Sequence, residues 1–179
     1  MNIKIFLQNT KSDFVGLPSI QMVELPIAED SLNKLMKLLE ADAFGNSEYI
    51  FVGYQASFQE LYKPLKSIAE IAALNELAAI LNLWKDDFEK RDTYKALLER
   101  FRPDDIQEAI KLTESVDKYT VLDEEIRDCF QLGEYLVDSG IVEVDEDDYC
   151  DYEEIGCYFD AYLTSYGFLC EKADLERRI

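Results

Sequence analysis

The chain has 179 residues, of which 48% are hydrophobic and 12% aromatic, a composition typical of a folded protein and not of a disordered acidic tail. Its 38 acids against 18 bases give a net charge of -20, which argues against nucleic acid or an anionic membrane surface as a direct partner, because both would repel it. The absence of histidine removes the commonest general base and the favoured nitrogen ligand of zinc.

Residues 1–62 predict a small α+β domain. Ile3, Ile5 and Leu7 alternate with more polar neighbours, and two further extended runs cover residues 20–25 and 49–54. Between these runs, AEDSLNKLMKLLEA has apolar residues at helical spacing. The first residues, MNIKIFLQNTK, are too short an apolar run to span a bilayer and lack a small-residue cleavage site, so we interpret them as the first strand of a cytoplasmic protein.

Residues 63–115 predict a helical middle domain. Ser67 and Glu70 have the spacing of a capping box, which would begin a helix with a broad apolar face that extends to Leu81. Further helices are predicted over residues 86–101 and, after Pro103, over residues 104–114.

Residues 116–179 predict an acidic α+β domain. The extended KYTVL leads directly into a helix over DEEIRDCFQLGEYLVDSG, and Gly140 occupies the left-handed position that follows a helix. The aromatic residues of EIGCYFDAYLTSYGFL suit a packed helix before a turn at Gly167. Residues 114–160 contain 17 acids and two bases, a net charge of -15 out of the total of -20. The negative charge is therefore concentrated in about a quarter of the chain.

The motifs of several chemical functions are absent. From Asp145, the stretch VEVDEDDYCDYEEIG has cysteine and glycine at the sixth and twelfth positions of a calcium loop, where glycine and glutamate are required. No phosphate-binding GxxxxGK or GxGxxG occurs, and the acids lie in runs that look solvent-facing, unlike the acid pair of a glycosidase. We therefore expect a non-enzymatic protein with no catalytic residue, no metal site and no cofactor.

The four cysteines stand at positions 129, 150, 157 and 170 and form no CxxC pair. With no histidine to complete a zinc site, we expect reduced, structural thiols.

The concentrated acids suggest a binding surface. A solubilising face is the simplest interpretation, but the self-repulsion of so many like charges is more than solubility requires. Twenty excess charges match about 34 Å of duplex DNA, roughly ten base pairs, at one charge per ~1.7 Å. We therefore interpret the acids as phosphate mimics that bind a basic protein; the candidates are Asp123, Glu124, Glu125, Asp128, Glu134, Asp138, Asp145, Glu146, Asp147, Asp148, Asp151, Glu153 and Glu154.

Nearly the whole chain resembles the ArdA antirestriction proteins, DNA mimics directed at type I restriction-modification enzymes. The resemblance is carried by IKIFLQN, QMVELPIAED, EYIFVGYQ, SIAEIAALNELAAIL, DEEIRDCFQLGEYLVDSG and YFDAYLTSYG. It implies an elongated, curved molecule of three small segments in series, and a homodimer formed through the third segment. The family's antirestriction motif corresponds here to Glu125, Asp128, Leu132, Gly133, Glu134, Tyr135, Leu136 and Gly140, and we expect the face from Leu132 to Tyr135 to contribute to the dimer contact.

The resemblance implies a protein of a mobile element or phage that occupies the DNA-binding groove of a host restriction-modification enzyme. One departure leaves the target enzyme open: the chain reads Tyr166-Gly167-Phe168-Leu169, without the Arg-Asp pair usual after Tyr-Gly in the family. Two alternatives also stay open, an acidic scaffold for basic proteins and a DNA mimic directed at another DNA-binding protein, such as a CRISPR nuclease or a nucleoid protein. A mimic requires its acids on ordered elements, whereas a scaffold can carry them on a mobile loop.

Overall fold

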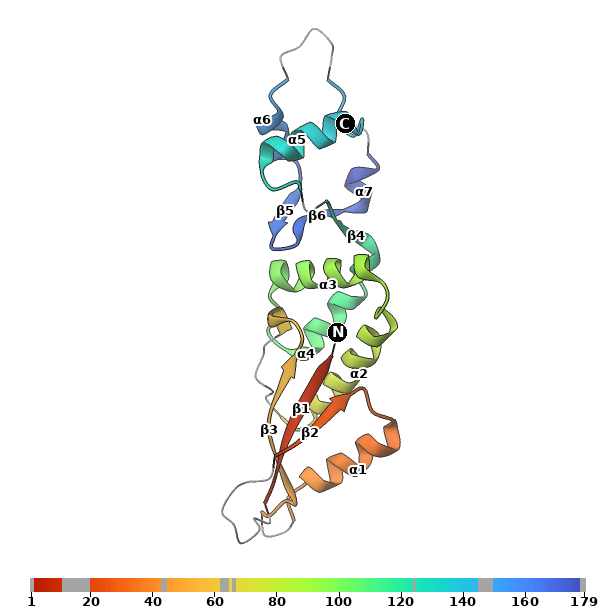
Figure 1. Ribbon diagram of the computed structural model, residues 1–179, viewed down its shortest axis with the longest axis vertical. Helices are drawn as coiled ribbons and strands as arrows, with labels where there is room; N and C mark the ends of the chain where they lie inside the picture. The colour runs from red at the N-terminus through yellow and green to blue at the C-terminus, as the bar shows by residue number, and fades with distance from the viewer. Residues whose placement is uncertain are drawn as a thin grey trace. The chain divides into compact units, whose positions relative to one another are not determined.

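The computed structural model describes residues 2–10, 20–42, 45–61, 65, 67–123, 125–144 and 150–177. Within these residues the chain is a mixed α+β protein with seven α-helices and two three-stranded antiparallel sheets (Figure 1). It divides into two compact units, the first formed by Met1–Asp86 with Pro103–Lys111 and the second by Asp87–Arg102 with Leu112–Ile179. The predicted helical middle domain thus contributes helices to both units. The boundaries after residues 62 and 115 stay a prediction.

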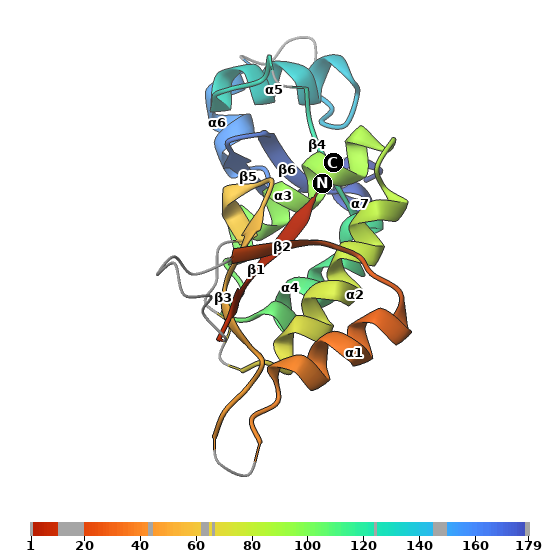
Figure 2. The ribbon, with the colours of Figure 1, turned by 60° about the horizontal axis from the view of Figure 1, so that its bottom comes forward.

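The first unit contains a sheet with the strand order β2-β1-β3. The strands are β1 (Ile3–Asn9), β2 (Ile20–Leu25) and β3 (Tyr49–Ala56), which confirms the three predicted extended runs. Ile3, Ile5 and Leu7 are buried because the alternation of β1 turns all three to one face of the sheet. Figure 2 shows helices α1 (Glu29–Leu39) and α2 (Glu70–Leu83) beside this sheet.

Helix α2 begins later than the predicted capping box requires. Its N-cap is Ala69, which provides no side-chain hydrogen bond, and the Glu70 N–H donates to the Ser67 carbonyl at 3.1 Å. Ser67 therefore belongs to a turn before the helix, and its hydroxyl does not cap it. The unit is completed by the short 3-10 helix η1 (Gln59–Leu61) and by most of α4 (Ile106–Thr113).

The second unit is built on the strand order β4-β6-β5. Helix α3 (Phe88–Phe101) packs against all three strands, and the Asp87 side chain caps it by accepting from the Lys90 N–H at 3.0 Å. The remaining elements of this part are η2 (Val116–Lys118), β4 (Tyr119–Val121), β5 (Ala161–Thr164), β6 (Gly167–Glu171) and α7 (Lys172–Leu175).

The prediction of one packed helix through the aromatic residues after Gly156 is wrong. The helix in this region, α6 (Tyr152–Tyr158), ends before most of these aromatic residues, and β5 and β6 follow it as a hairpin. The Thr164 hydroxyl fixes the hairpin turn, because it donates to the Gly167 carbonyl at 2.7 Å and accepts from the Tyr166 N–H at 3.1 Å. Gly167 has a φ of 128°, a value that favours glycine. The chain therefore turns at Ser165 and Tyr166 instead of continuing as a helix.

Two helices complete the second unit: α5 (Cys129–Asp138) and α6 (Tyr152–Tyr158). The predicted helix over residues 123–140 is shorter than expected, because Asp128 caps it and the residues before it form a turn. The predicted end is confirmed: Gly140 has a φ of 67°, and the Ile141 and Gly140 N–H groups donate to the Leu136 and Val137 carbonyls, both at 2.9 Å. This is the Schellman pattern of a helix C-terminus.

The core of the second unit lies between α5 and the sheet. It contains Leu122, Ile126, Leu132, Leu136, Ile141, Phe168 and Cys170. Phe130 is 50% exposed, and its ring packs edge to face against the Tyr152 ring, with 5.6 Å between the ring centroids. The buried face of α5 consists of Leu132, Gly133 and Leu136.

Candidate functional site: the acidic helix pair

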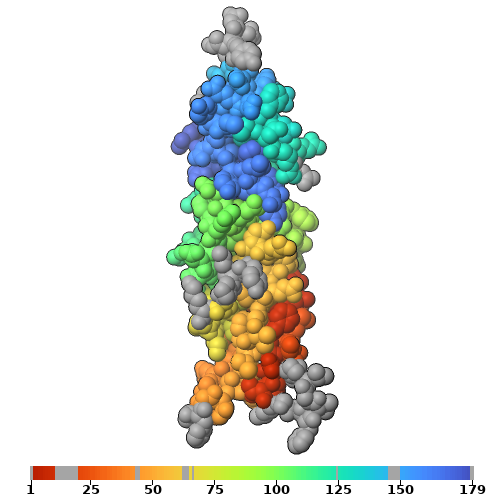
Figure 3. All heavy atoms as spheres, turned by 90° about the vertical axis from the view of Figure 1, so that its left-hand side faces the viewer, coloured from red at the N-terminus to blue at the C-terminus, as the bar shows by residue number. Residues whose placement is uncertain are grey.

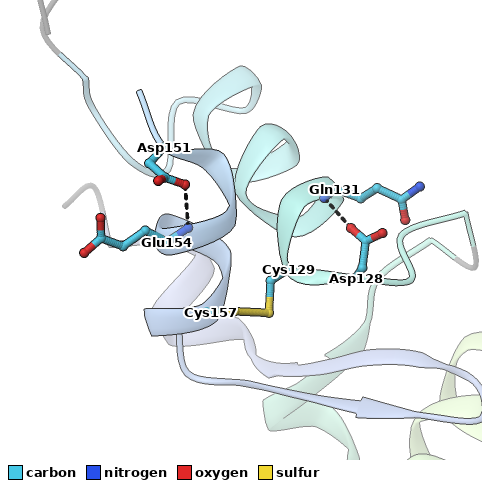
Figure 4. Close-up of a disulfide and its surroundings, with 6 residues drawn as sticks. All are labelled: Asp128, Cys129, Gln131, Asp151, Glu154 and Cys157. Carbon is cyan, nitrogen blue, oxygen red and sulfur yellow. Dashed lines mark hydrogen bonds between the residues drawn. A yellow bond between two sulfur atoms is a disulfide. The ribbon is translucent and has the colours of Figure 1, made fainter. Parts of the chain in front are cut away.

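We use the name acidic helix pair for α5 and α6 together with their capping residues Asp128 and Asp151. The Asp128 carboxylate accepts from the Gln131 N–H at 2.8 Å, and the Gln131 side chain accepts in turn from the Arg127 N–H at 2.7 Å. Asp151 accepts from the Glu154 N–H at 3.0 Å (Figure 4). Both caps satisfy backbone donors that a helix end leaves without partners, so these two acids hold the helices in place besides carrying charge.

The two helices cross with their backbones in direct contact, and glycine makes this possible. A Cβ atom added to Gly133 would overlap the Tyr152 carbonyl, and one added to Gly156 would overlap the Cys129 carbonyl. Each helix thus contributes one glycine at the point where the other passes. The crossing requires glycine at both positions.

A disulfide between Cys129 and Cys157 joins the pair covalently (Figure 4). The Cα atoms lie 5.1 Å apart, within the range of about 4.4 to 6.8 Å that a disulfide spans. The expectation of four reduced thiols is therefore wrong for these two residues, which the crossing of α5 and α6 brings together. Cys150 and Cys170 are free thiols.

We expect the disulfide to stabilise the fold without being needed for binding. It closes a loop with a sequence separation of 28, for which loop-closure entropy predicts a stabilisation of about 2 to 4 kcal/mol. The double variant Cys129→Ser/Cys157→Ser should unfold at correspondingly lower urea concentration than the oxidised protein, and thiol reduction of the wild type should reproduce the shift. Wherever the variant remains folded, its affinity for a basic partner should be unchanged. Equal urea midpoints for the variant and the oxidised protein would contradict this expectation.

The predicted phosphate mimics that the structure describes are all exposed. Asp123 and Glu125 lie in the turn before α5, and the others lie on the acidic helix pair: Asp128, Glu134, Asp138, Asp151, Glu153 and Glu154. Figure 3 shows α5 in teal and α6 in blue at the molecular surface. Glu124, Asp145, Glu146, Asp147 and Asp148 lie outside the described residues. Six of the thirteen candidates are thus carried by capped and cross-linked helices.

The spacing on α5 is also suited to mimicry. Glu134 and Asp138 are four residues apart on the same helix, so they lie one above the other with an axial separation of about 6 Å. The two carboxylates therefore present closely spaced negative charges on one side of the helix, as a DNA strand does along its backbone.

The negative charge around the acidic helix pair changes the pKa of Tyr152, at the start of α6. The pKa of its phenol is raised above the ordinary value, first by the neighbouring Cys150 side chain, then by desolvation and by the Asp138 carboxylate. Glu134 acts in the same direction. The N-terminal end of α6 and the acids of α5 therefore share one electrostatic environment.

The two free cysteines should differ in reactivity. Burial, with smaller effects of Asp174 and Asp160, raises the pKa of the Cys170 thiol to about 12, whereas Cys150 is half-buried. We expect a thiol reagent at pH 8 to label one cysteine in the native, unreduced protein and two after unfolding in denaturant. The Cys150→Ser variant should show no fast labelling, and two fast thiols in the native protein would contradict the assignment.

The same shift has a consequence for stability. The pKa of Cys170 is higher in the folded protein than the ordinary value of 9.0. The neutral thiol therefore contributes fully to the free energy of unfolding below pH 9, and this contribution is lost as the pH rises through about 12.

The predicted dimer face is largely inside the protomer. Leu132 and Leu136 are fully buried in the core of their own unit, and Gly133 is covered by α6. These three residues are therefore covered within the protomer, and their role in a dimer contact stays a prediction. Tyr135 was predicted together with these three residues, and it is the one of the four that is partly accessible.

Sequence reasoning missed the disulfide and the close crossing. For the crossing, the available signal was glycine within each helical pattern, at positions 133 and 156, since a glycine inside a helix often marks a close backbone approach.

The described part of the chain shows neither a metal-binding cluster nor a membrane-spanning helix. The described residues contain no group of three or more His, Cys, Asp or Glu side chains arranged to hold a metal ion. None of the described helices has the length and apolar character needed to cross a bilayer. Comparisons of the chain with protein-family models, curated proteins and solved structures find no match.

Proposed function

We propose that the chain is a non-enzymatic DNA mimic that occupies the DNA-binding groove of a type I restriction-modification enzyme in the cytoplasm of a host cell. The observation that supports this most strongly is the acidic helix pair, on which exposed carboxylates stand on capped, cross-linked helices. An acidic scaffold has no need to order its charges in this way. The resemblance of the sequence to antirestriction proteins supports the choice of target.

The proposed mechanism is competition. Carboxylates on the pair meet the lysine and arginine side chains that would otherwise bind phosphates, and the enzyme cannot hold DNA at the same time. A net charge of -20 steers the protein toward a basic groove, so association should be fast at low salt and slower as salt increases.

The test is a DNA-cleavage and methylation assay with a purified type I enzyme and increasing amounts of the protein. Competition requires that the concentration for half inhibition rises linearly with the DNA concentration. Inhibition that does not depend on the DNA concentration would refute the mechanism. An absence of inhibition, together with salt-sensitive binding to unrelated basic proteins, would favour the scaffold.

We also propose a homodimer formed through the second unit, as the resemblance implies. Of the predicted face, Leu132, Gly133 and Leu136 are buried, and the accessible part of Tyr135 is a candidate for the contact. Sedimentation equilibrium at micromolar concentration and physiological salt tests this directly, and a monomer under these conditions would refute it.

A further inference from the structure

An open groove of about 830 Å³ lies between α6, the segment 142–144 and α7, all within the second unit. Its volume is in the range of about 300 to 1,000 Å³ that is usual for ligand sites. Apolar side chains line its floor: Val142, Val144, Ile155 and Phe159. Three of them, Val142, Ile155 and Phe159, are half-buried and pack against the core of the unit. The floor is therefore held in place by the fold.

Exposed acidic side chains also line this groove, and we call them its rim. Asp151, Glu154 and Asp160 are exposed at the groove, and a fourth acid, Asp174, lies 3.6 Å from the Arg177 guanidinium. Among the described residues that line the groove, Arg177 is the one positive group. The groove thus combines an apolar floor with a rim of net negative charge.

We propose that this groove docks a cationic amphipathic segment of a partner protein. A bulky aliphatic or aromatic side chain of the partner would occupy the floor, and neighbouring lysine or arginine side chains would reach the rim acids. An anionic or purely apolar segment would leave the rim carboxylates repelled or desolvated without partners, at a cost in free energy. A basic segment without apolar side chains would leave the apolar floor of the groove exposed to water.

Two further observations favour a basic protein as the occupant. Tyr158 lines the groove with 83% of its surface exposed, and an accessible tyrosine provides a rigid contact surface and a ring face for a cation. A second copy of this chain would bring its own net charge of -20 to a rim that is already acidic. The charge of the groove therefore selects a positively charged partner.

This inference deepens the proposed function and rests on it only in that both require a basic protein partner. The DNA mimic needs nothing from its target except positive charge in the right places. If the groove is used, the partner must also insert an apolar side chain into it.

The test uses the full chain and fluorescence anisotropy with two labelled peptides. One is an amphipathic helix of leucine and lysine, and the other has serine in place of every leucine with the same number of lysines. The leucine peptide should bind on the order of tenfold more tightly than the serine peptide, because it alone can fill the floor. Equal affinity for the two peptides would overturn the proposal, since charge alone would then explain binding.

Groove variants locate the binding site. Val144→Ser should weaken the leucine peptide severalfold and leave the serine peptide unchanged. Tyr158→Ser also removes a ring face for lysine, so it should weaken the leucine peptide severalfold and the serine peptide less. Leu83→Ser, at a residue 81% exposed in the first unit, is the matched control. Glu154→Gln with Asp160→Asn should reduce the salt dependence of binding. Because Tyr158 is so exposed, its variant tests the proposal even if Val144→Ser does not fold. No change with either groove variant would overturn the proposal.

The remaining outcomes are also decisive. If the wild type self-associates and Tyr158→Ser abolishes the association, the occupant is a second copy and the proposal is overturned. The peptide assay contains no restriction enzyme, so its failure leaves competition with DNA to be judged by the cleavage assay. Loss of competition in that assay would, in turn, leave a demonstrated peptide site standing.

Discussion

Neutralising four exposed acids of the acidic helix pair should weaken binding to the target enzyme by roughly fourfold to several-hundredfold. The changes are Glu134→Gln, Asp138→Asn, Glu153→Gln and Glu154→Gln, and all four side chains are exposed and lie outside the cap hydrogen bonds. An exposed ion pair contributes about 0.2 to 1 kcal/mol, so each single change should be nearly silent and the loss should appear as changes accumulate. Inhibitor affinity across the series, at two salt concentrations, measures this.

A matched control separates position from total charge. Glu29→Gln, Glu40→Gln, Glu76→Gln and Asp86→Asn remove the same charge from exposed positions of the first unit. We expect the control to lose much less affinity than the helix-pair variant, and both to unfold at the wild-type temperature or slightly above, because repulsion falls. A single neutralisation that abolished inhibition in a folded protein would contradict a distributed mimic. Equal losses in the two sets would show that only net charge matters.

Adding one methyl group at the helix crossing should disrupt the second unit. In Gly156→Ala the new Cβ would overlap the Cys129 carbonyl, and in Gly133→Ala it would overlap the Tyr152 carbonyl. Backbone atoms cannot move aside as a side chain can, so each variant should lower the free energy of unfolding by about 3 kcal/mol or more. The double variant should fail to form the crossing. Urea unfolding followed by circular dichroism measures the loss.

Gly53→Ala is the control for this experiment. Gly53 lies in β3, and a Cβ atom added there would meet nothing within 4 Å. Its free energy of unfolding should stay within about 1 kcal/mol of the wild type. Unchanged stability in Gly156→Ala would mean that α5 and α6 do not touch as described.

Local sequence patterns predicted the elements whose structure depends on neighbouring residues. The alternation of Ile3, Ile5 and Leu7 corresponds to β1, and Gly140 ends α5 in the left-handed conformation. The hairpin after Tyr158 was missed because the spacing of Tyr158, Tyr162 and Tyr166 also fits one face of a helix. What decides the structure is the pairing of β6 with β4, where Thr120 lies opposite Cys170. That partner is fifty residues away and leaves no local signal.

The candidate site was predictable in its charge and not in its geometry. The run of acids was evident from composition, and the exposure of Glu134, Asp138 and Glu153 follows from their charge. The pairing of Cys129 with Cys157 and the groove beside α6 arise from packing between segments distant in sequence. Neither has a motif that spacing could reveal.

The bond between Cys129 and Cys157 also determines what happens if a protease cuts the chain between the two cysteines. The residues from Cys129 to Cys157 form a closed covalent ring, so one cut anywhere inside it opens the ring without releasing a fragment. The strands β5 and β6 would remain tethered to α5, and the exposed acids on both helices would stay on one particle. Such a nicked protein would run as a single species without reductant and as two fragments with it. A protease that cuts once inside this ring would therefore leave an oxidised copy in one piece.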